Sequence, residues 1–351
     1  MEHYQRAIET LNYKPTDRVA TWGGWIRNPQ FFESLTGKKF WKNPRAVAIE
    51  AYKKIGVDMV LEKMLLPSKT NEWQQQKKVA DKYKTPGDMV KKIRSLPDIK
   101  AIRQKYNVDH FYPKLKAEIA KFEAEFGKDI LVIPQCGSTK FALYIDYGYT
   151  NYFTAIKRYP EEIIKAYDVF TEITRGMNEA WRKLIEEGKM TPYFYTGWDI
   201  CDQRGPMVSP EFLKSIYFPR LRRSLEPLVE IGARIIWHSD GYIINLIDEL
   251  LKCGINGFQG FQENLGFDIG EVAEKMKKAG KIPLFLAGVN VNETLPFGKE
   301  EDVKKEVKRI IDTVTAADGY LAMGTANTAE DDCPVENLET LYRFTQEYQY
   351  R

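Results

Sequence analysis

The sequence has few cysteines and no long apolar run. Its 351 residues include four cysteines, at positions 136, 201, 253 and 333, which form no C-x-x-C pair and no disulfide framework. No apolar run approaches the roughly 20 residues that span a bilayer. The amphipathic start, MEHYQRAIETLN, lacks the apolar centre of a signal peptide. These absences predict a protein of the reducing cytoplasm that does not enter a membrane.

The sequence also lacks an excess of either charge. Its 52 Lys and Arg nearly balance its 49 Asp and Glu, so no basic face indicates a nucleic acid partner. Mixed runs such as residues 299–309 (KEEDVKKEVKR) are typical of the solvated side of a helix. With 43% hydrophobic and 29% charged residues, the composition indicates a globular protein with one large α/β domain or two smaller ones.

The clearest pattern lies in residues 233–259, ARIIWHSDGYIINLIDELLKCGINGFQ. A short apolar strand, 234–237, leads into a polar turn that carries His238 and Asp240. Apolar residues then recur at helical spacing over 243–251, before the next apolar strand begins. This order predicts a β/α unit with His238 at the carboxyl end of its strand, where β/α barrels carry their chemistry.

The same alternation extends along the chain. The predicted strands cover residues 18–25, 58–61, 129–134, 190–198, 234–237, 255–259, 282–287 and 319–323. The predicted helices cover residues 1–12, 43–55, 113–126, 141–157, 160–187, 213–230, 243–251, 269–279 and 300–316. This pattern predicts a single (β/α)8 TIM barrel over residues 1–351, with a polar insertion, a hairpin or lid, at about 67–97. A doubly wound sheet is the alternative, but no G-x-G-x-x-G follows the first strand.

The residues that follow the strands are the expected site of a barrel. They are Trp22, Gly23, Gly24, Trp25, Gln135, Cys136, Trp198, Asp199, Asp202, His238, Asp240, Gln259, Gln262, Asn290 and Asn327. Acids, amides and aromatic rings around one histidine are the lining that a small-molecule site needs. The predicted substrate contacts are Trp22, Trp25, Trp198, Gln135, Gln259, Asn290 and Asn327.

His238 and Asp240 are the leading candidates for catalysis. In H-x-D across a turn, both side chains can aim at one point, where a carboxylate either ligates a metal or orients the imidazole. Asp202 is a further candidate ligand, although acids near Ser209-Pro210 can instead serve the start of a helix. Cys333 is either a fourth ligand or a buried, inert thiol. Taken alone, a histidine after a strand is more often structural than a ligand, and it is Asp240 and Asp202 that favour a functional role.

Six segments carry a family resemblance, in order and across nearly the whole chain. They are KPTDRV leading into WGG (14–24), GPMVSPE (205–211), HSDG (238–241), LAGVN (286–290), LPFG (295–298) and CPVEN (333–337). The chain thereby resembles the uroporphyrinogen decarboxylase superfamily. The resemblance implies a distorted TIM barrel, often dimeric. It also implies either a decarboxylase or one of the cobalamin-dependent methyltransferases built on that barrel.

The residues at two of these positions favour the methyltransferases. The decarboxylase has an arginine-rich N-terminal signature that clamps substrate carboxylates, whereas WGGWIR (22–27) contains one arginine. The coenzyme M methyltransferases carry H-x-C and a later cysteine, and the matching positions here are Asp240 and, roughly, Asn327. Oxygen ligands suit an oxygen substrate better than a thiolate.

The resemblance therefore favours the O-demethylase methyltransferases. Their proposed zinc motif consists of acids and a histidine. Asp202 and His238 have the spacing of the motif's outer members. At the position of its central acid, this chain has Tyr217 instead. The implied reaction moves a methyl group from a methoxylated, aromatic substrate to Co(I) of a separate corrinoid protein, which carries the cobalamin. His238, Asp240 and Asp202 would hold zinc or supply a proton, with Tyr217 as a second donor.

Three other functions remain open from the sequence. One is methyl transfer with another carrier, such as a thiol, an amine or a pterin. Another is a reaction like that of uroporphyrinogen decarboxylase. The last is a ligand-binding barrel without catalysis. A homodimer is compatible with each of them.

Overall fold

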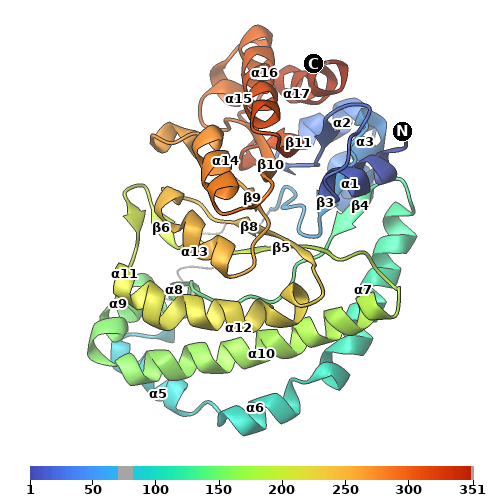
Figure 1. The fold of residues 1–351 in the computed structure, drawn as a ribbon. Coiled ribbons are helices and arrows are strands. Elements are labelled where there is room, and N and C mark those ends of the chain that lie inside the picture. Colours follow the sequence, from blue (N-terminus) through green and yellow to red (C-terminus); the bar gives the residue numbers. More distant parts are fainter. Residues whose placement is uncertain (70–81, 349–351) are drawn as a thin grey trace.

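Eight parallel strands form a closed barrel in the computed structural model, which describes residues 1–69 and 82–348 (Figure 1). These strands are β1 (Ala20–Thr21), β3 (Met59–Leu61), β4 (Leu131–Ile133), β5 (Tyr193–Gly197), β8 (Arg234–His238), β9 (Gly257–Gln259), β10 (Leu284–Val289) and β11 (Tyr320–Thr325). Six pair in the order β1-β11-β10-β9-β8-β5, and β3 pairs with β4. Parallel bridges from Trp22 to Met59 and from Gln135 to Tyr195 complete the ring. The predicted (β/α)8 barrel is confirmed.

Two short pairs of strands lie beyond the barrel strands. β2 (Trp25–Ile26) pairs with β12 (Thr328–Ala329), and β6 (Cys201–Asp202) pairs with β7 (Gly205–Pro206). The predicted first strand is therefore divided into β1 and β2. The division follows from Gly24, whose φ of +67° favours glycine and whose added Cβ would lie 2.7 Å from the Thr325 hydroxyl.

Helices cover the outside of the barrel. The main ones are α1 (His3–Leu11), α2 (Pro29–Thr36), α3 (Pro44–Ile55), α5 (Pro86–Arg94), α6 (Ile99–Lys105), α7 (Val108–Phe126), α8 (Tyr144–Tyr147), α9 (Tyr149–Arg158), α10 (Pro160–Glu186), α12 (Phe218–Val229), α13 (Ile247–Lys252), α14 (Ile269–Lys278), α15 (Thr294–Phe297), α16 (Glu300–Ala316) and α17 (Val335–Glu347). Figure 1 shows α10 beside α12, with α5, α6 and α7 packed on the far side of α10.

Caps and breaks in the helices follow from local sequence. The Asn43 side chain accepts a hydrogen bond from the backbone N–H of Ala46 at the start of α3, and Gly56 ends that helix with a φ of 82°. The predicted helix 141–157 is instead two helices, α8 and α9, divided at Gly148, whose φ is 86°. The predicted helix 213–230 begins with the short α11 (Pro210–Phe212) and a π-helical turn, Leu213–Tyr217, before α12.

Side chains alternate between two cores because successive residues of a strand point to opposite faces. The inner core fills the barrel with residues such as Leu61, Ile133, Ile236 and Leu286. The outer core lies between the strands and the helices and includes the neighbours of these residues, such as Trp237. Helix α1 contributes apolar side chains to the inner core and contacts β1, β3, β4 and β11. It thus closes the end of the barrel where the strands begin, which we call the base.

An ion cluster fixes α1 at the base. Asp58, whose side chain is fully buried, accepts hydrogen bonds from Arg6 of α1 (2.6 Å), from Arg18 (2.9 Å) and from the backbone N–H of Thr21 (2.8 Å). Arg6 also binds Asp17 at 2.7 Å. The KPTDRV segment is therefore part of the structural base of the barrel.

The predicted insertion at about 67–97 is described only in part. Residues 70–81 lie outside the described residues, and α5 occupies residues 86–94. Within residues 1–69 and 82–348, no helix combines the length and the apolar character needed to cross a membrane.

Candidate functional site

His238 ends strand β8 and points into the barrel. It lies two residues after Ile236, a member of the inner core, and so shares its face of the sheet. In the parallel register, His238 pairs with Gly197 of β5 on one side and with Gln259 of β9 on the other. A Cβ at Gly197 would lie 2.0 Å from the carbonyl oxygen of His238, so only glycine lets β5 approach β8 this closely.

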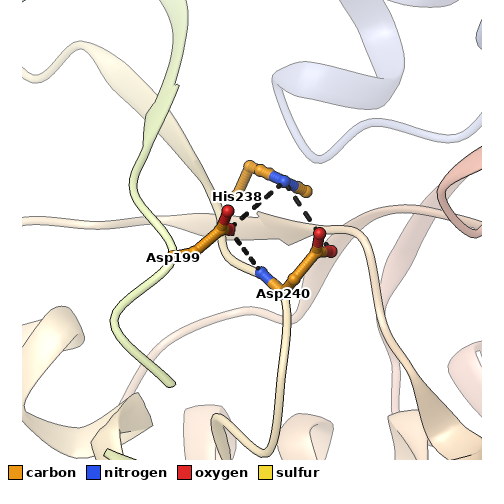
Figure 2. Close-up of side chains that lie close together, drawn as sticks. All are labelled: Asp199, His238 and Asp240. Atoms are coloured by element: carbon orange, nitrogen blue, oxygen red, sulfur yellow. Dashed lines mark hydrogen bonds and ion pairs between the residues drawn. The ribbon is translucent and has the colours of Figure 1, made fainter. Parts of the chain in front are cut away.

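Two carboxylates face the imidazole of His238 (Figure 2). Its Nε2 lies 3.9 Å from Oδ1 of Asp199, which follows β5, and 3.8 Å from Oδ1 of Asp240, which follows β8. The two acids are held together because the backbone N–H of Asp240 donates to Oδ1 of Asp199 at 2.9 Å. All three residues are partly buried and lie at the barrel mouth, the end where the strands finish.

Neighbouring side chains orient Asp240. Nδ2 of Asn327, which follows β11, donates to Oδ1 of Asp240 at 2.6 Å. The next backbone N–H, of Gly241, donates to Oε1 of Gln262 at 2.6 Å. Burial raises the pKa of Asp240 above its usual range; His238 and the Asn327 hydrogen bond lower it, and the Asp199 carboxylate raises it. The Asp240 carboxyl therefore keeps its proton more readily than an exposed aspartate.

Trp25 supports the imidazole from the side. The two rings are 4.8 Å apart between centroids and meet edge to face, at 80°. The indole N–H of Trp25 donates to the carbonyl oxygen of Lys63 at 2.9 Å, which fixes the ring. Trp22 packs edge to face on Trp25, with centroids 6.1 Å apart.

Asp199, His238 and Asp240, which we call the acid–histidine group, fit a divalent cation. The distances from Nε2 to the two carboxylates exceed a direct hydrogen bond, and the three ligand atoms all lie within 4.8 Å of one another. Zinc bonds to nitrogen and oxygen are roughly 2.0–2.2 Å long, so two ligands of one ion are at most about 4.4 Å apart. The distances of 3.9 and 3.8 Å from Nε2 to the two carboxylates are within this limit. One imidazole and two carboxylates would leave coordination positions open for a substrate atom.

Asp199, and not Asp202, provides the second carboxylate. Asp202 lies in the β6–β7 hairpin, where it binds the side chain of Arg204 at 2.9 Å and accepts a bond from the backbone N–H of Arg204 at 2.8 Å. Its side chain is 40% exposed and turns toward this arginine. Asp199 was among the strand-end residues in the sequence, and its position directly after Trp198 was the only signal for it.

Tyr217 and Cys333 are also absent from the acid–histidine group. Tyr217 is fully buried in the outer core, and its hydroxyl donates to the carbonyl oxygen of Thr139 at 3.1 Å. Burial raises the pKa of the Cys333 thiol to about 12, as do the nearby acids, and the side chain is packed in the outer core. Cys333 is fully buried in the outer core, away from the ligand atoms of Asp199, His238 and Asp240, and so fits the structural interpretation.

The other predicted substrate contacts are spread around the barrel mouth. Trp22 is fully buried, and its indole N–H donates to the carbonyl oxygen of Ala287 at 3.1 Å. Trp198 and Gln135 line a cavity of about 300 Å³. Asn290 lines another, of about 470 Å³. Among residues 1–69 and 82–348, three of the predicted contacts adjoin the acid–histidine group: Trp25 packs on His238, Gln259 pairs with it in the strand register, and Asn327 binds Asp240.

The fold and the acid–histidine group define a TIM-barrel protein with a candidate cation site at its mouth. The sequence of the uroporphyrinogen decarboxylase (URO-D) family matches residues 46–348, and the chain belongs to that family. No curated protein matches the sequence significantly. The fold is similar to that of a methyltransferase from Methanosarcina mazei, with a TM-score of 0.66, 14% identity and 99% of both chains covered. At this identity the likeness shows the fold alone.

Proposed function

We propose that the protein is a corrinoid-dependent methyltransferase that takes a methyl group from a methoxylated aromatic compound. The acceptor would be Co(I) of a separate corrinoid protein. The observation that supports this most is the acid–histidine group, in which His238 faces two carboxylates. The likeness in fold to a protein named as a methyltransferase supports the same class of reaction.

The group provides what cleavage of an aryl methyl ether needs. When the O–CH3 bond breaks, its electron pair stays on the oxygen and the methyl group passes to cobalt, so negative charge develops on a poor leaving group. A zinc ion held by Asp199, His238 and Asp240 would act as a Lewis acid toward that oxygen. Without a metal, Asp240, whose pKa is raised by burial, would instead supply the proton that the leaving oxygen takes up.

The exposure of the two acids suits a reaction with a second protein. The side chains of Asp199 and Asp240 are 46% and 37% exposed, so a methyl group bound beside them is within reach from outside the barrel. His238, at 18%, lies deeper and is supported by Trp25. A substrate ring would lie between these residues with its methyl group toward solvent, where the corrinoid protein docks.

A decarboxylase that acts on a substrate with many carboxylates fits this site less well. The carboxylates of Asp199 and Asp240 face His238, and they would repel such a substrate. Arg204, in the hairpin that follows β5, is paired with Asp202. A clamp for several carboxylates would need fixed cations at the mouth.

The test is an assay with reduced corrinoid protein and a panel of methoxyarenes, followed by the spectral change from Co(I) to methyl-Co(III). We expect transfer with at least one methoxyarene and about one zinc per chain. Asp199→Ala should reduce zinc affinity by at least ~100-fold and abolish transfer, because it removes a ligand. Asp202→Ala, three residues away, should retain both.

Two results would contradict the proposal. Equal zinc content and activity in Asp199→Ala and the unaltered protein would show that the acid–histidine group is not the site. Transfer from a methylamine or a methylthiol, with none from any methoxyarene, would show a different methyl carrier.

A further inference from the structure

A buried amide lies beside His238 without a hydrogen-bond partner. Gln259 is 1% exposed, and within residues 1–69 and 82–348 neither its Oε1 nor its Nε2 has a partner. The buried Nδ1 of His238 also has no hydrogen-bond partner within these residues. Buried polar atoms are nearly always paired in folded proteins, and each unpaired one weakens the fold. Three of them on adjacent positions indicate that something polar binds there.

The strand register places Gln259 and His238 on the same interior face. They are direct partners in the pairing of β8 with β9. Their neighbours Trp237 and Phe258, also direct partners, belong to the outer core, so Gln259 and His238 point the other way, into the barrel. Adjacent strands are about 4.8 Å apart, so a small molecule held at His238 lies within reach of the amide.

The residue after Gln259 keeps the Nδ1 side of the imidazole free of side chains. Gly260 has a φ of +79°, and a Cβ there would lie 2.7 Å from Nδ1 of His238. Any other residue would fill this space and strain the backbone. The chain thus places a bare backbone beside the imidazole Nδ1, and the buried amide is at the position paired with His238 on the next strand.

We propose that Gln259 determines the specificity of the site by binding a hydroxyl group of the substrate next to its methoxy group. The inference rests on the proposed function and names the substrate class more narrowly. An amide offers one acceptor and two donors. A hydroxyl can donate to Oε1 and accept from Nε2, whereas an ether or a carboxylate oxygen only accepts and leaves Oε1 unpaired. Because Gln259 is adjacent to His238, the hydroxyl belongs on the ring carbon beside the methoxy carbon.

The test compares two probes, 2-methoxyphenol and 1,2-dimethoxybenzene. The hydroxyl group of the first is replaced by a second methoxy group in the other. Calorimetry with the protein alone should show that 2-methoxyphenol binds about 10- to 100-fold more tightly, the effect of a buried amide losing its partner. In Gln259→Met, which keeps the length of the side chain and removes its polar atoms, the two probes should bind within about 3-fold of each other.

Thermal unfolding without ligand provides a readout that a structural role would not give. Gln259→Met should raise Tm, because it removes polar atoms that have no partner in the free protein. The matched control is Gln346→Met. Nε2 of Gln346 donates to the carbonyl oxygen of Ile55 at 2.7 Å, so this change should lower Tm.

Failure of the inference and failure of the proposed function give different results. A lower Tm for Gln259→Met, or an unchanged preference between the probes, would overturn the inference even if methyl transfer occurs. Binding of 2-methoxyphenol that depends on Gln259, without methyl transfer to cobalt, would overturn the proposed function and leave the inference intact.

Discussion

Two asparagines follow strands at the barrel mouth, and their side chains have different partners. Asn327 donates to Oδ1 of Asp240 at 2.6 Å, so it contacts the acid–histidine group through a ligand. Asn290 instead accepts from the backbone N–H groups of Asn292 (2.7 Å) and Glu293 (3.1 Å), which forms a turn. Asn327 is therefore a positioning residue, and Asn290 shapes its own loop.

This difference predicts that replacing Asn327 lowers the affinity for zinc and that replacing Asn290 does not. Asn327→Ala should weaken zinc binding by about 10- to 100-fold, as is usual when a hydrogen bond to a ligand is lost. Asn290→Ala should leave zinc affinity unchanged and lower Tm slightly. Competition with a chelator measures the first quantity. Equal zinc affinity in the two variants would show that Asn327 does not orient Asp240.

The sequence could predict His238 and Asp240 but could not choose between Asp199 and Asp202. His238 and Asp240 follow a strand with an unmistakable apolar pattern, and the H-x-D spacing places both at its end. The segment after β5 forms a hairpin that depends on pairing between Cys201 and Pro206 and between Asp202 and Gly205. The hairpin is local, but its two turn residues, Gln203 and Arg204, are not the Asn-Gly or Asp-Gly pair that marks such a turn. The sequence pattern therefore did not predict the hairpin or the direction of Asp202.

At the scale of elements, helix α7 meets the end of strand β3 through two glutamates. Glu118 of α7 and Glu62, which follows β3, line the cavity of about 300 Å³ that also contains Trp198. Glu62 is held because its Oε2 accepts from the backbone N–H of Gln135 at 2.8 Å. Burial raises the pKa of Glu118 from 4.5 to about 7, and the charge of Glu62 raises it as well.

The pair predicts a pH-dependent stability. Since the folded state holds the Glu118 proton more tightly than the unfolded state, the resulting stabilisation is complete below pH 4.5 and is lost as pH rises through about 7. Glu118→Gln prevents this loss of stability at high pH, because the glutamine side chain is neutral at every pH. Its Tm should match that of the unaltered protein at pH 5 and exceed it at pH 8. Glu123→Gln, an exposed position on α7, should follow the unaltered protein; a constant gap from pH 5 to pH 8 would contradict the assignment.

The local sequence predicted the positions of the helices better than the points where a helix is interrupted. Apolar periodicity found α10, α14 and α16 within a few residues, because each has one buried face. It joined α8 and α9 into one helix, since the aromatic residues on both sides of Gly148 continue the helical spacing. The break requires a positive φ at Gly148, and glycine permits that conformation without demanding it.

At the scale of the whole molecule, the base of the barrel depends on Asp58. The residue joins α1, the segment before β1 and the start of β3 through Arg6, Arg18 and Thr21. Asp58→Asn should lower the free energy of unfolding by about 3 to 5 kcal/mol, because it leaves buried arginines without their full counter-charge. Asp318→Asn should cost less than about 1 kcal/mol, since that side chain is 89% exposed in its pair with Lys277. Urea unfolding measures both; equal effects would contradict the role of the cluster.

The whole architecture was predictable from sequence because eight apolar strands alternate with helices, which few folds accommodate. Its closure was not visible locally. The bridges from Trp22 to Met59 and from Gln135 to Tyr195 join residues that are far apart or in short strands. The same limit applies to the site, where Asp199, His238 and Asn327 lie at or just after the ends of three separate strands, β5, β8 and β11.

The α1 base and the loops at the mouth lie at opposite ends of the strands, and this separation has an evolutionary consequence. Mutations in the loops can alter what is recognised while the Asp58 cluster continues to hold the chain folded. The same fold can then hold very different sequences, as in the structural neighbour that shares 14% of its residues with this chain at 99% coverage of both chains. Changes at one end of such a barrel can therefore alter its substrate while the other end stays as it is.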